Sequence, residues 1–200
     1  FPSSISPDGR MLILNRFEEN DDGSSKLSAL VAVNLENPDE QLELIASQDE
    51  NIFYPSGAVS PDGAWIAFVE IDQQTGLEVF VQPFPGGGAR VQVSQDGGLK
   101  PRWSPDGTEL FFKASGDRFM AASITTEPNL AAAAPRLLFE NDYDWGTYMP
   151  MPGYSVSSDG PTLIMVKPDP DFGKTSEIRL VIDWLAELER LVRTGNRSSN

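Results

Sequence analysis

The 200 residues carry 15 Lys and Arg against 30 Asp and Glu, and the resulting formal charge of −15 repels nucleic acid phosphates and anionic membrane surfaces. Histidine and cysteine are absent, which excludes Ser-His-Asp triads, thiolate nucleophiles, disulfides and zinc held by these side chains. With 17 Gly and 16 Pro beside 40% hydrophobic residues, the composition favours many short strands joined by turns. No run approaches the roughly 18 apolar residues that a membrane-spanning helix needs.

One tetrapeptide recurs along the chain and divides it into four repeats. Three copies are identical, namely Ser6-Pro7-Asp8-Gly9, Ser60-Pro61-Asp62-Gly63 and Ser104-Pro105-Asp106-Gly107, and the fourth is Ser157-Ser158-Asp159-Gly160. The copies begin 54, 44 and 53 residues apart. Such self-similarity is typical of proteins built from repeated structural units.

The tetrapeptide has the chemistry of a tight hairpin turn. Proline presets φ at the second position of a type I turn, aspartate suits the third, and glycine accepts the left-handed conformation that follows. Segments with strand-like patterns flank each copy. We therefore predict structural turn roles for Asp8, Gly9, Asp62, Gly63, Asp106, Gly107, Asp159 and Gly160.

Each of the first three hairpins is followed by two further strand-like segments. We expect these strands at 27–35 and 41–46 in the first repeat, 78–84 and 89–93 in the second, and 118–124 and 135–140 in the third. The glycines at 86–88 form the turn within the second pair. Four antiparallel strands at a period of about 40 to 55 residues predict an all-β protein, a β-propeller with blades at about 1–50, 51–97, 98–141 and 153–182.

The C-terminal part of the chain departs from this pattern. The segment 178–182 is predicted to be the third strand of the last blade, 183–194 a short helix, and 195–200 a polar tail. Asp183 can cap the helix and Gly195 can end it. Its apolar stripe consists of Trp184, Leu185, Leu188, Leu191 and Val192.

The turns and their flanking strands resemble the WD-repeat-like blades of TolB-type propellers. The Trp-containing C-terminal segment resembles the tails of propellers attached to bacterial eukaryotic-like Ser/Thr kinases and some winged-helix regulators, with Asp183 where those tails usually have Asn. The resemblance implies six or more blades in the whole protein, so that blades upstream of Phe1 would complete the propeller. A closed ring of four blades is the alternative.

Two groups of residues are candidates for sites beyond the turns. Asp169 and Asp171 are either solvated loop acids or oxygen ligands for calcium. The segment 143–152, which joins two blades, is either a contact surface or a plug in the propeller channel, and its candidate contact residues are Tyr143, Trp145, Tyr148, Met149 and Met151. For Trp65 and Trp103 we expect packing between blades.

These patterns predict no catalytic residue, no cofactor and no nucleic acid partner. The expected function is a non-catalytic module that binds a protein or a small ligand, as the C-terminal sensory or interaction domain of a bacterial multidomain protein. The alternative is the propeller of a prolyl-oligopeptidase-type serine peptidase, although no Gly-x-Ser-x-Gly nucleophile motif follows the last blade. We expect no membrane insertion by this segment and an extracytoplasmic location in a bacterium, with the cytoplasm as the alternative. A targeting signal would lie upstream of Phe1.

Overall fold

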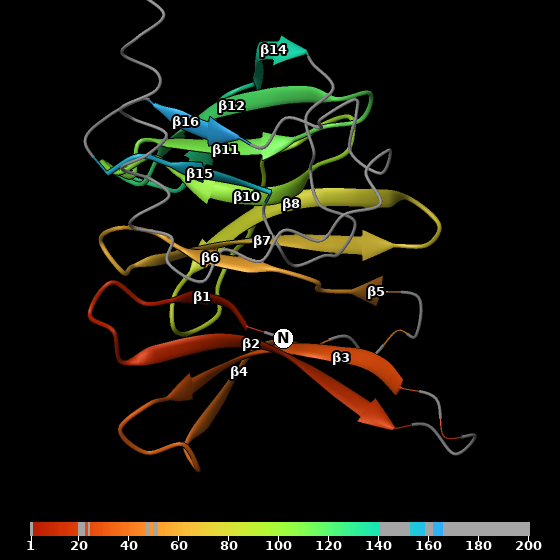
Figure 1. Cartoon of the computed structure of the whole chain (residues 1–200), viewed down its shortest axis with the longest axis vertical. Helices are drawn as coiled ribbons and strands as arrows, with labels where there is room; N and C mark the ends of the chain where they lie inside the picture. Colours follow the sequence, from red (N-terminus) through yellow and green to blue (C-terminus); the bar gives the residue numbers. More distant parts are fainter. Residues whose placement is uncertain are drawn as a thin grey trace, which may run out of the picture. The chain divides into compact units, whose positions relative to one another are not determined.

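The structure is a computed structural model that describes residues 2–19, 23, 25–46, 49, 52–140, 153–158 and 162–165. All of these lie in the first of the two units into which the chain divides, Phe1–Lys167. The described residues form antiparallel sheets joined by turns, and they contain no helix, so none that could cross a membrane (Figure 1).

The first sheet, which we name blade A, has four antiparallel strands in the order in which they follow along the chain. They are β1 (Pro2–Ile5), β2 (Met11–Glu19), β3 (Ser25–Asn34) and β4 (Gln41–Ala46). The strands β3 and β4 fall on the two segments, 27–35 and 41–46, that the apolar pattern predicts.

In the second sheet, blade B, two short segments together take the place of the first strand. The strands are β5 (Ile52–Phe53), β6 (Gly57–Val59), β7 (Trp65–Asp72), β8 (Gly76–Pro83) and β9 (Val91–Gln92). Both β5 and β6 pair with β7. Pro55 lies in the gap between them and has no N–H to donate to a neighbouring strand, which accounts for part of the interruption.

The third sheet, blade C, contains one strand that the sequence pattern does not predict. Its strands are β10 (Leu99–Trp103), β11 (Glu109–Lys113), β12 (Arg118–Thr125), β13 (Ala131–Ala132) and β14 (Arg136–Glu140). The long strand β12 pairs with β14 near its start and with β13 at its end. The segment 131–134 consists of alanine alone, so it has no alternation from which β13 could be predicted.

The described part of blade D is a pair of antiparallel strands, β15 (Tyr154–Val156) and β16 (Leu163–Met165). The expected strand at 178–182, helix at 183–194 and polar tail at 195–200 lie outside the described residues.

Neighbouring residues of one strand point into different cores, and this arrangement defines the fold. Ile66 and Phe68 of β7 pack against blade A, whereas Ala67 and Val69 pack against blade C. In β11, Phe112 faces blade B and the adjacent Phe111 faces blade D. Sheets with apolar side chains on both faces must be covered on both faces.

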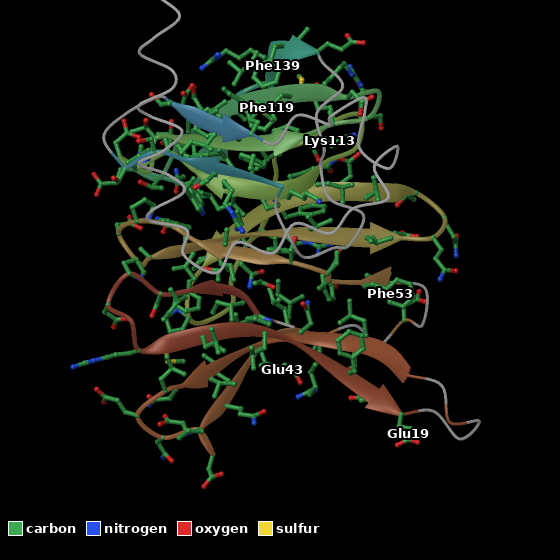
Figure 2. The ribbon with its side chains drawn as sticks, in the orientation of Figure 1. Glu19, Glu43, Phe53, Lys113, Phe119 and Phe139 are labelled. Carbon is green, nitrogen blue, oxygen red and sulfur yellow. The ribbon has the colours of Figure 1, made fainter. Side chains whose placement is uncertain are left out.

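Stacked four-stranded sheets of this kind are propeller blades, so the predicted all-β propeller architecture is confirmed. Each large apolar side chain that is fully buried between blades, such as Phe68 or Phe112, contributes about 1.5–3 kcal/mol. Between blades C and D, the ring of Phe119 stacks on Phe139, with centroids 5.0 Å apart, and meets Tyr154 edge-on at 4.9 Å. Figure 2 labels Phe119 and Phe139 in blade C.

Candidate ligand site where the first strands meet

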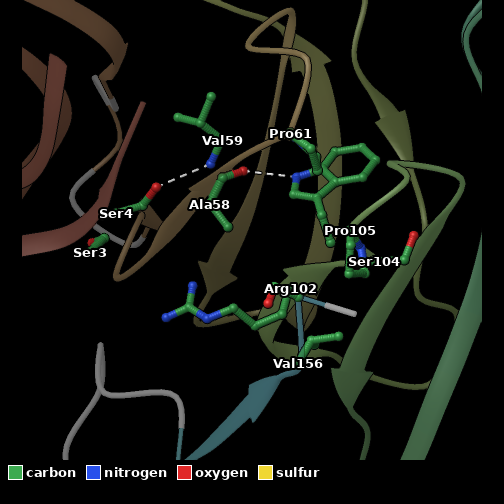
Figure 3. A pocket seen from close by; sticks show the side chains of 11 residues that line it. Ser3, Ser4, Ala58, Val59, Pro61, Arg102, Ser104, Pro105 and Val156 are labelled. Atoms are coloured by element: carbon green, nitrogen blue, oxygen red, sulfur yellow. Dashed lines mark hydrogen bonds between the residues drawn. The ribbon is translucent and has the colours of Figure 1, made fainter. Parts of the chain in front are cut away.

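The first strands of the blades lie beside one another. The strand β6 contacts both β1 and β10, and β10 contacts β15. The backbone N–H of Val59 donates to Ser4 Oγ at 3.2 Å and joins the first strands of blades A and B (Figure 3). In a propeller the first strand of each blade is the one nearest the central axis, so these four strands surround one axial region.

The recurring turns at the ends of these strands share one hydrogen-bond pattern. The hydroxyl groups of Ser6, Ser60 and Ser104 donate to the carboxylate of the aspartate two residues on, at 2.5, 2.5 and 2.6 Å. Each hydroxyl also accepts the N–H of the fifth residue on, and each carboxylate accepts the N–H of the second residue after it. The following Gly9, Gly63 and Gly107 have φ of 74°, 72° and 73°, in the left-handed region.

These contacts lower the pKa of two turn aspartates. The hydrogen bond from Ser6, followed by the N–H of Arg10, holds the pKa of Asp8 below its ordinary value. The hydrogen bond from Ser104 and then that from the N–H of Thr108 do the same for Asp106. Asp8, Asp62 and Asp106 thus each accept hydrogen bonds within their own turn.

Sequence reasoning assigned no role to the serine of the tetrapeptide, although it is the residue most committed to the turn. Ser6, Ser60 and Ser104 are 5%, 1% and 7% exposed. Each one links the aspartate to the start of the second strand of its hairpin. Its presence in all four copies, including the copy that lacks proline, was the signal that could have revealed this. Asp159 and Gly160 of the fourth turn lie outside the described residues, and on its described flanks the N–H of Ser157 donates to Thr162 O at 2.8 Å.

Buried side chains hydrogen-bond across each blade interface. Asn15 Nδ2 of blade A donates to Tyr54 O at 2.8 Å, and Trp103 Nε1 of blade C donates to Ala58 O of blade B at 3.0 Å. The hydroxyl of Tyr154 in blade D donates to Lys100 O of blade C at 2.7 Å. These bonds fix the spacing of the blades because the acceptors are backbone atoms of the neighbouring sheet. As expected from the sequence, Trp103 lies between two blades, with 7% of its surface exposed, while Trp65 is partly buried against the same core.

A pocket of about 430 Å³ opens where the first strands and their turns converge (Figure 3). It draws on all four blades and is lined by Ser3, Ser4, Ala58, Val59, Pro61, Arg102, Trp103, Ser104, Pro105, Val156 and Ser158. We name it the axial pocket. Its volume lies within the range of about 300–1,000 Å³ that is common for small-molecule sites. The walls combine apolar side chains, serine hydroxyls and one cation.

Arg102 is the ionisable side chain among the described lining residues, and Figure 3 shows it extending from β10 into the pocket. Within the described part of the chain, Nη1 of Arg102 donates a long hydrogen bond to Pro101 O, at 3.4 Å. Burial lowers the pKa of Arg102 below its ordinary value, and the nearby Tyr154 acts in the opposite direction. A guanidinium stays charged at neutral pH, so the axial pocket contains a positive charge.

The described lining of the axial pocket offers polar and apolar contacts to a ligand. The same described lining contains no carboxylate, and the hydroxyl of Ser104 donates to the carboxylate of Asp106, which belongs to the turn. In the described residues no three acidic side chains are grouped closely enough to hold a metal ion. Arg102 and this pocket were missed from the sequence, where Arg102 is simply one residue of a predicted strand.

The other candidate residues from the sequence cannot be placed. The possible calcium ligands Asp169 and Asp171 lie outside the described residues. The same holds for the candidate contact surface of Tyr143, Trp145, Tyr148, Met149 and Met151. Both therefore stay predictions.

No protein-family model matches the chain, and no curated protein gives a significant match. Among solved structures it is similar to TolB from Acinetobacter baumannii, with 21% identity and a TM-score of 0.43 over 66% of this chain and 31% of TolB. It is also similar to prolyl oligopeptidase B from Galerina marginata, with 11% identity and a TM-score of 0.48 over 70% of this chain and 21% of the peptidase. For a gluconolactonase from Xanthomonas campestris the values are 14% and 0.47, over 80% of this chain and 66% of that one.

The chain thus spans about a third of TolB and about a fifth of the peptidase. Because these identities and TM-scores are low, we assign the fold from the sheets of the chain itself. The class that the sheets define is a β-propeller module.

Proposed function

We propose that this propeller is a non-catalytic binding module whose ligand site is the axial pocket. The observation that carries the proposal is the convergence of residues from four separate blades on one cavity of small-molecule size. A pocket with one guanidinium, several hydroxyls and apolar walls offers fixed polar contacts for orientation and apolar surface for affinity. Its described lining offers no acid–base pair.

We further propose that the module is the C-terminal sensory or interaction domain of a bacterial multidomain protein, such as a eukaryotic-like Ser/Thr kinase or a transcriptional regulator. This part is supported by the resemblance of the TolB-type turns and of the Trp-containing segment at 183–194. In such a protein, ligand binding at the axial pocket would bias the activity of a separate domain.

A blocking variant tests the binding role. Ser158 lines the axial pocket and is exposed, so Ser158→Trp should fill the pocket without disturbing a core. Gln73→Trp is the matched control, since Gln73 is exposed in the turn between β7 and β8. A panel of small acids, bases, sugars and short peptides is tested for stabilisation in thermal unfolding, because a ligand that binds the folded state raises its stability.

Ligands of the axial pocket should stabilise the wild type and Gln73→Trp but not Ser158→Trp. Stabilisation that survives in Ser158→Trp would place the site elsewhere, and a panel without any stabilising ligand would contradict the binding role. In a parent protein with a kinase domain, Ser158→Trp should abolish the response of phosphoryl transfer to the ligand and leave the basal rate unchanged.

A further inference from the structure

Arg102 differs from the other arginines of the described ranges in its partners. Each of the others forms an ion pair with a described carboxylate: Arg10 with Glu36, Arg16 with Glu43, Arg90 with Glu70, Arg118 with Asp96 and Arg136 with Glu109. Arg102 has no such pair with a described carboxylate, in a chain where acidic residues outnumber basic ones two to one. A guanidinium offers five N–H donors, and its contact to Pro101 O uses one of them at a long distance.

The fold of a blade also does not require an arginine at the position of Arg102. Aligning the blades on the serine of the turn places Arg102 at the position held by Ser4 in blade A, Ala58 in blade B and Ser155 in blade D. Three blades therefore form with a small uncharged residue there. Since Ser4 and Ala58 line the axial pocket as well, the position is one that faces the axis, and blade C alone places a charge at it.

The surroundings of Arg102 define what it could hold. Ala58, Val59 and Val156 provide apolar wall, and the hydroxyls of Ser3 and Ser158 provide polar edges. A planar guanidinium matches a carboxylate through two parallel hydrogen bonds. The formal charge of −15 on the chain opposes the approach of polyanions, and a single cation balances a single negative charge.

We propose that the axial pocket binds a compound with one carboxylate and an apolar body, with the carboxylate on Arg102 and the body against the apolar wall. The proposal rests on the proposed function, because it names the ligand class of that same pocket. The carboxylate would come from a free small acid or from the C-terminus of a peptide, which share this chemistry.

The test is a titration of the purified chain followed by ligand-observed NMR and calorimetry. Benzoate is the first probe, with benzamide as its uncharged match, inorganic phosphate as a more highly charged anion, and N-acetyl-phenylalanine to represent a peptide C-terminus. Arg102→Met removes the charge while keeping much of the side-chain volume. Arg102→Lys keeps the charge but removes the planar guanidinium that can form two parallel hydrogen bonds. Arg136→Met is the matched control, because Arg136 is an exposed residue of β14 paired with Glu109.

The wild type and Arg136→Met should bind benzoate and N-acetyl-phenylalanine more tightly than benzamide or phosphate. Arg102→Met should weaken binding of the two acids by about tenfold or more, as expected for a lost charge-assisted pair, and Arg102→Lys by less. Tighter binding of N-acetyl-phenylalanine than of benzoate would point to a peptide C-terminus, and the reverse to a free acid. The benzoate–benzamide comparison uses the wild type alone, so it stands even if the Arg102 variants fold poorly.

The proposal is overturned if the wild type binds neither acid, if benzamide binds as tightly as benzoate, or if a folded Arg102→Met binds benzoate like the wild type. The two levels of inference can be told apart. Other ligands that bind the wild type and are lost in Ser158→Trp would preserve the proposed function while refuting the carboxylate. Both would be refuted if Ser158→Trp weakened the binding of no ligand, benzoate included, and Arg102→Met bound benzoate like the wild type.

Discussion

The indole nitrogen of Trp103 in blade C donates a hydrogen bond to the carbonyl oxygen of Ala58 in blade B, at 3.0 Å. Ala58 lies on β6, the segment of blade B that pairs with β7 close to the axial pocket. The bond therefore ties two first strands together beside the proposed ligand site. It is one of a set of buried hydrogen bonds that run from a side chain of one blade to the backbone of the next.

Replacing Trp103 tests the energy of this tie. Trp103→Phe leaves the buried Ala58 carbonyl without its donor, so we expect the free energy of unfolding to fall by about 1–3 kcal/mol. Urea denaturation followed by circular dichroism measures it. Trp65→Phe is the control, because Trp65 is only partly buried, and it should cost clearly less. If both variants lost the same free energy of unfolding, the hydrogen bond would add nothing to the stability that packing provides.

Tyr154 predicts how stability depends on alkaline pH. Burial raises the pKa of its phenol far above the ordinary value of 10.0, so the folded state keeps the proton that the unfolded state releases. The stabilisation is fully present below pH 10 and is lost as the pH rises beyond it, by about 1.4 kcal/mol per pH unit. Tyr154→Phe should be less stable at neutral pH by about 1–3 kcal/mol, because Lys100 O loses its donor.

Above pH 10 the stability of the wild type should fall more steeply than that of Tyr154→Phe, so that the two curves converge. Denaturant unfolding at a series of pH values from neutral to strongly alkaline provides the measurement. Parallel curves would show that Tyr154 ionises as readily in the folded as in the unfolded state.

The turn aspartates predict the opposite dependence, at acid pH. Hydrogen bonds from Ser104 and Thr108 lower the pKa of Asp106 below its ordinary value of 3.8. A depressed pKa stabilises the fold above the ordinary pKa, and this contribution disappears as the pH falls through the folded value. Asp106→Asn should therefore lower the urea midpoint more at neutral pH than at strongly acid pH. Asp39→Asn, in an exposed turn of blade A, is the control and should change the midpoint little at either pH. A pH-independent loss in Asp106→Asn would assign its role to shape instead of charge.

Gly98, which directly precedes β10 of blade C, lies very close to residues of blade B. A Cβ atom added there would lie 2.7 Å from Val79 Cγ2 and 2.8 Å from Ser94 Cβ, closer than such atoms pack. Gly98→Ala should therefore lower the free energy of unfolding by about 1–3 kcal/mol. At Gly87 a Cβ would meet nothing within 4 Å, so Gly87→Ala is the matched control and should be neutral or slightly stabilising. Thermal unfolding of the two variants distinguishes them, and similar midpoints would contradict the crowding at Gly98.

The blade architecture was predictable because its determinants are local. The turn chemistry of the tetrapeptide and the apolar runs such as 65–69 depend on neighbours in sequence, and both locate strands directly. The alternation of β7 between two cores also follows from the period of a strand, since successive side chains point to opposite faces.

The axial pocket was not predictable in the same way. Ser4, Ala58, Arg102 and Val156 come from four blades, and only the packing of the first strands side by side brings them together. The strand β13 escaped prediction because it depends on its partner β12 and not on its own alanines. The hydroxyl contacts of Tyr154 likewise join residues more than 40 positions apart, and no local pattern encodes such a distance.

The turn that recurs in the described blades is closed entirely by bonds among six consecutive residues, for example those from Ser6 to Met11. A gene duplication that copies one blade therefore also copies a complete turn. The turn forms without any compensating change in the other blades. The residues two positions before the serine take no part in the hydrogen bonds that close the turn. Paralogous blades can thus diverge at the axis, acquiring an arginine in one copy and an alanine in another, while the inherited turn keeps every copy folded.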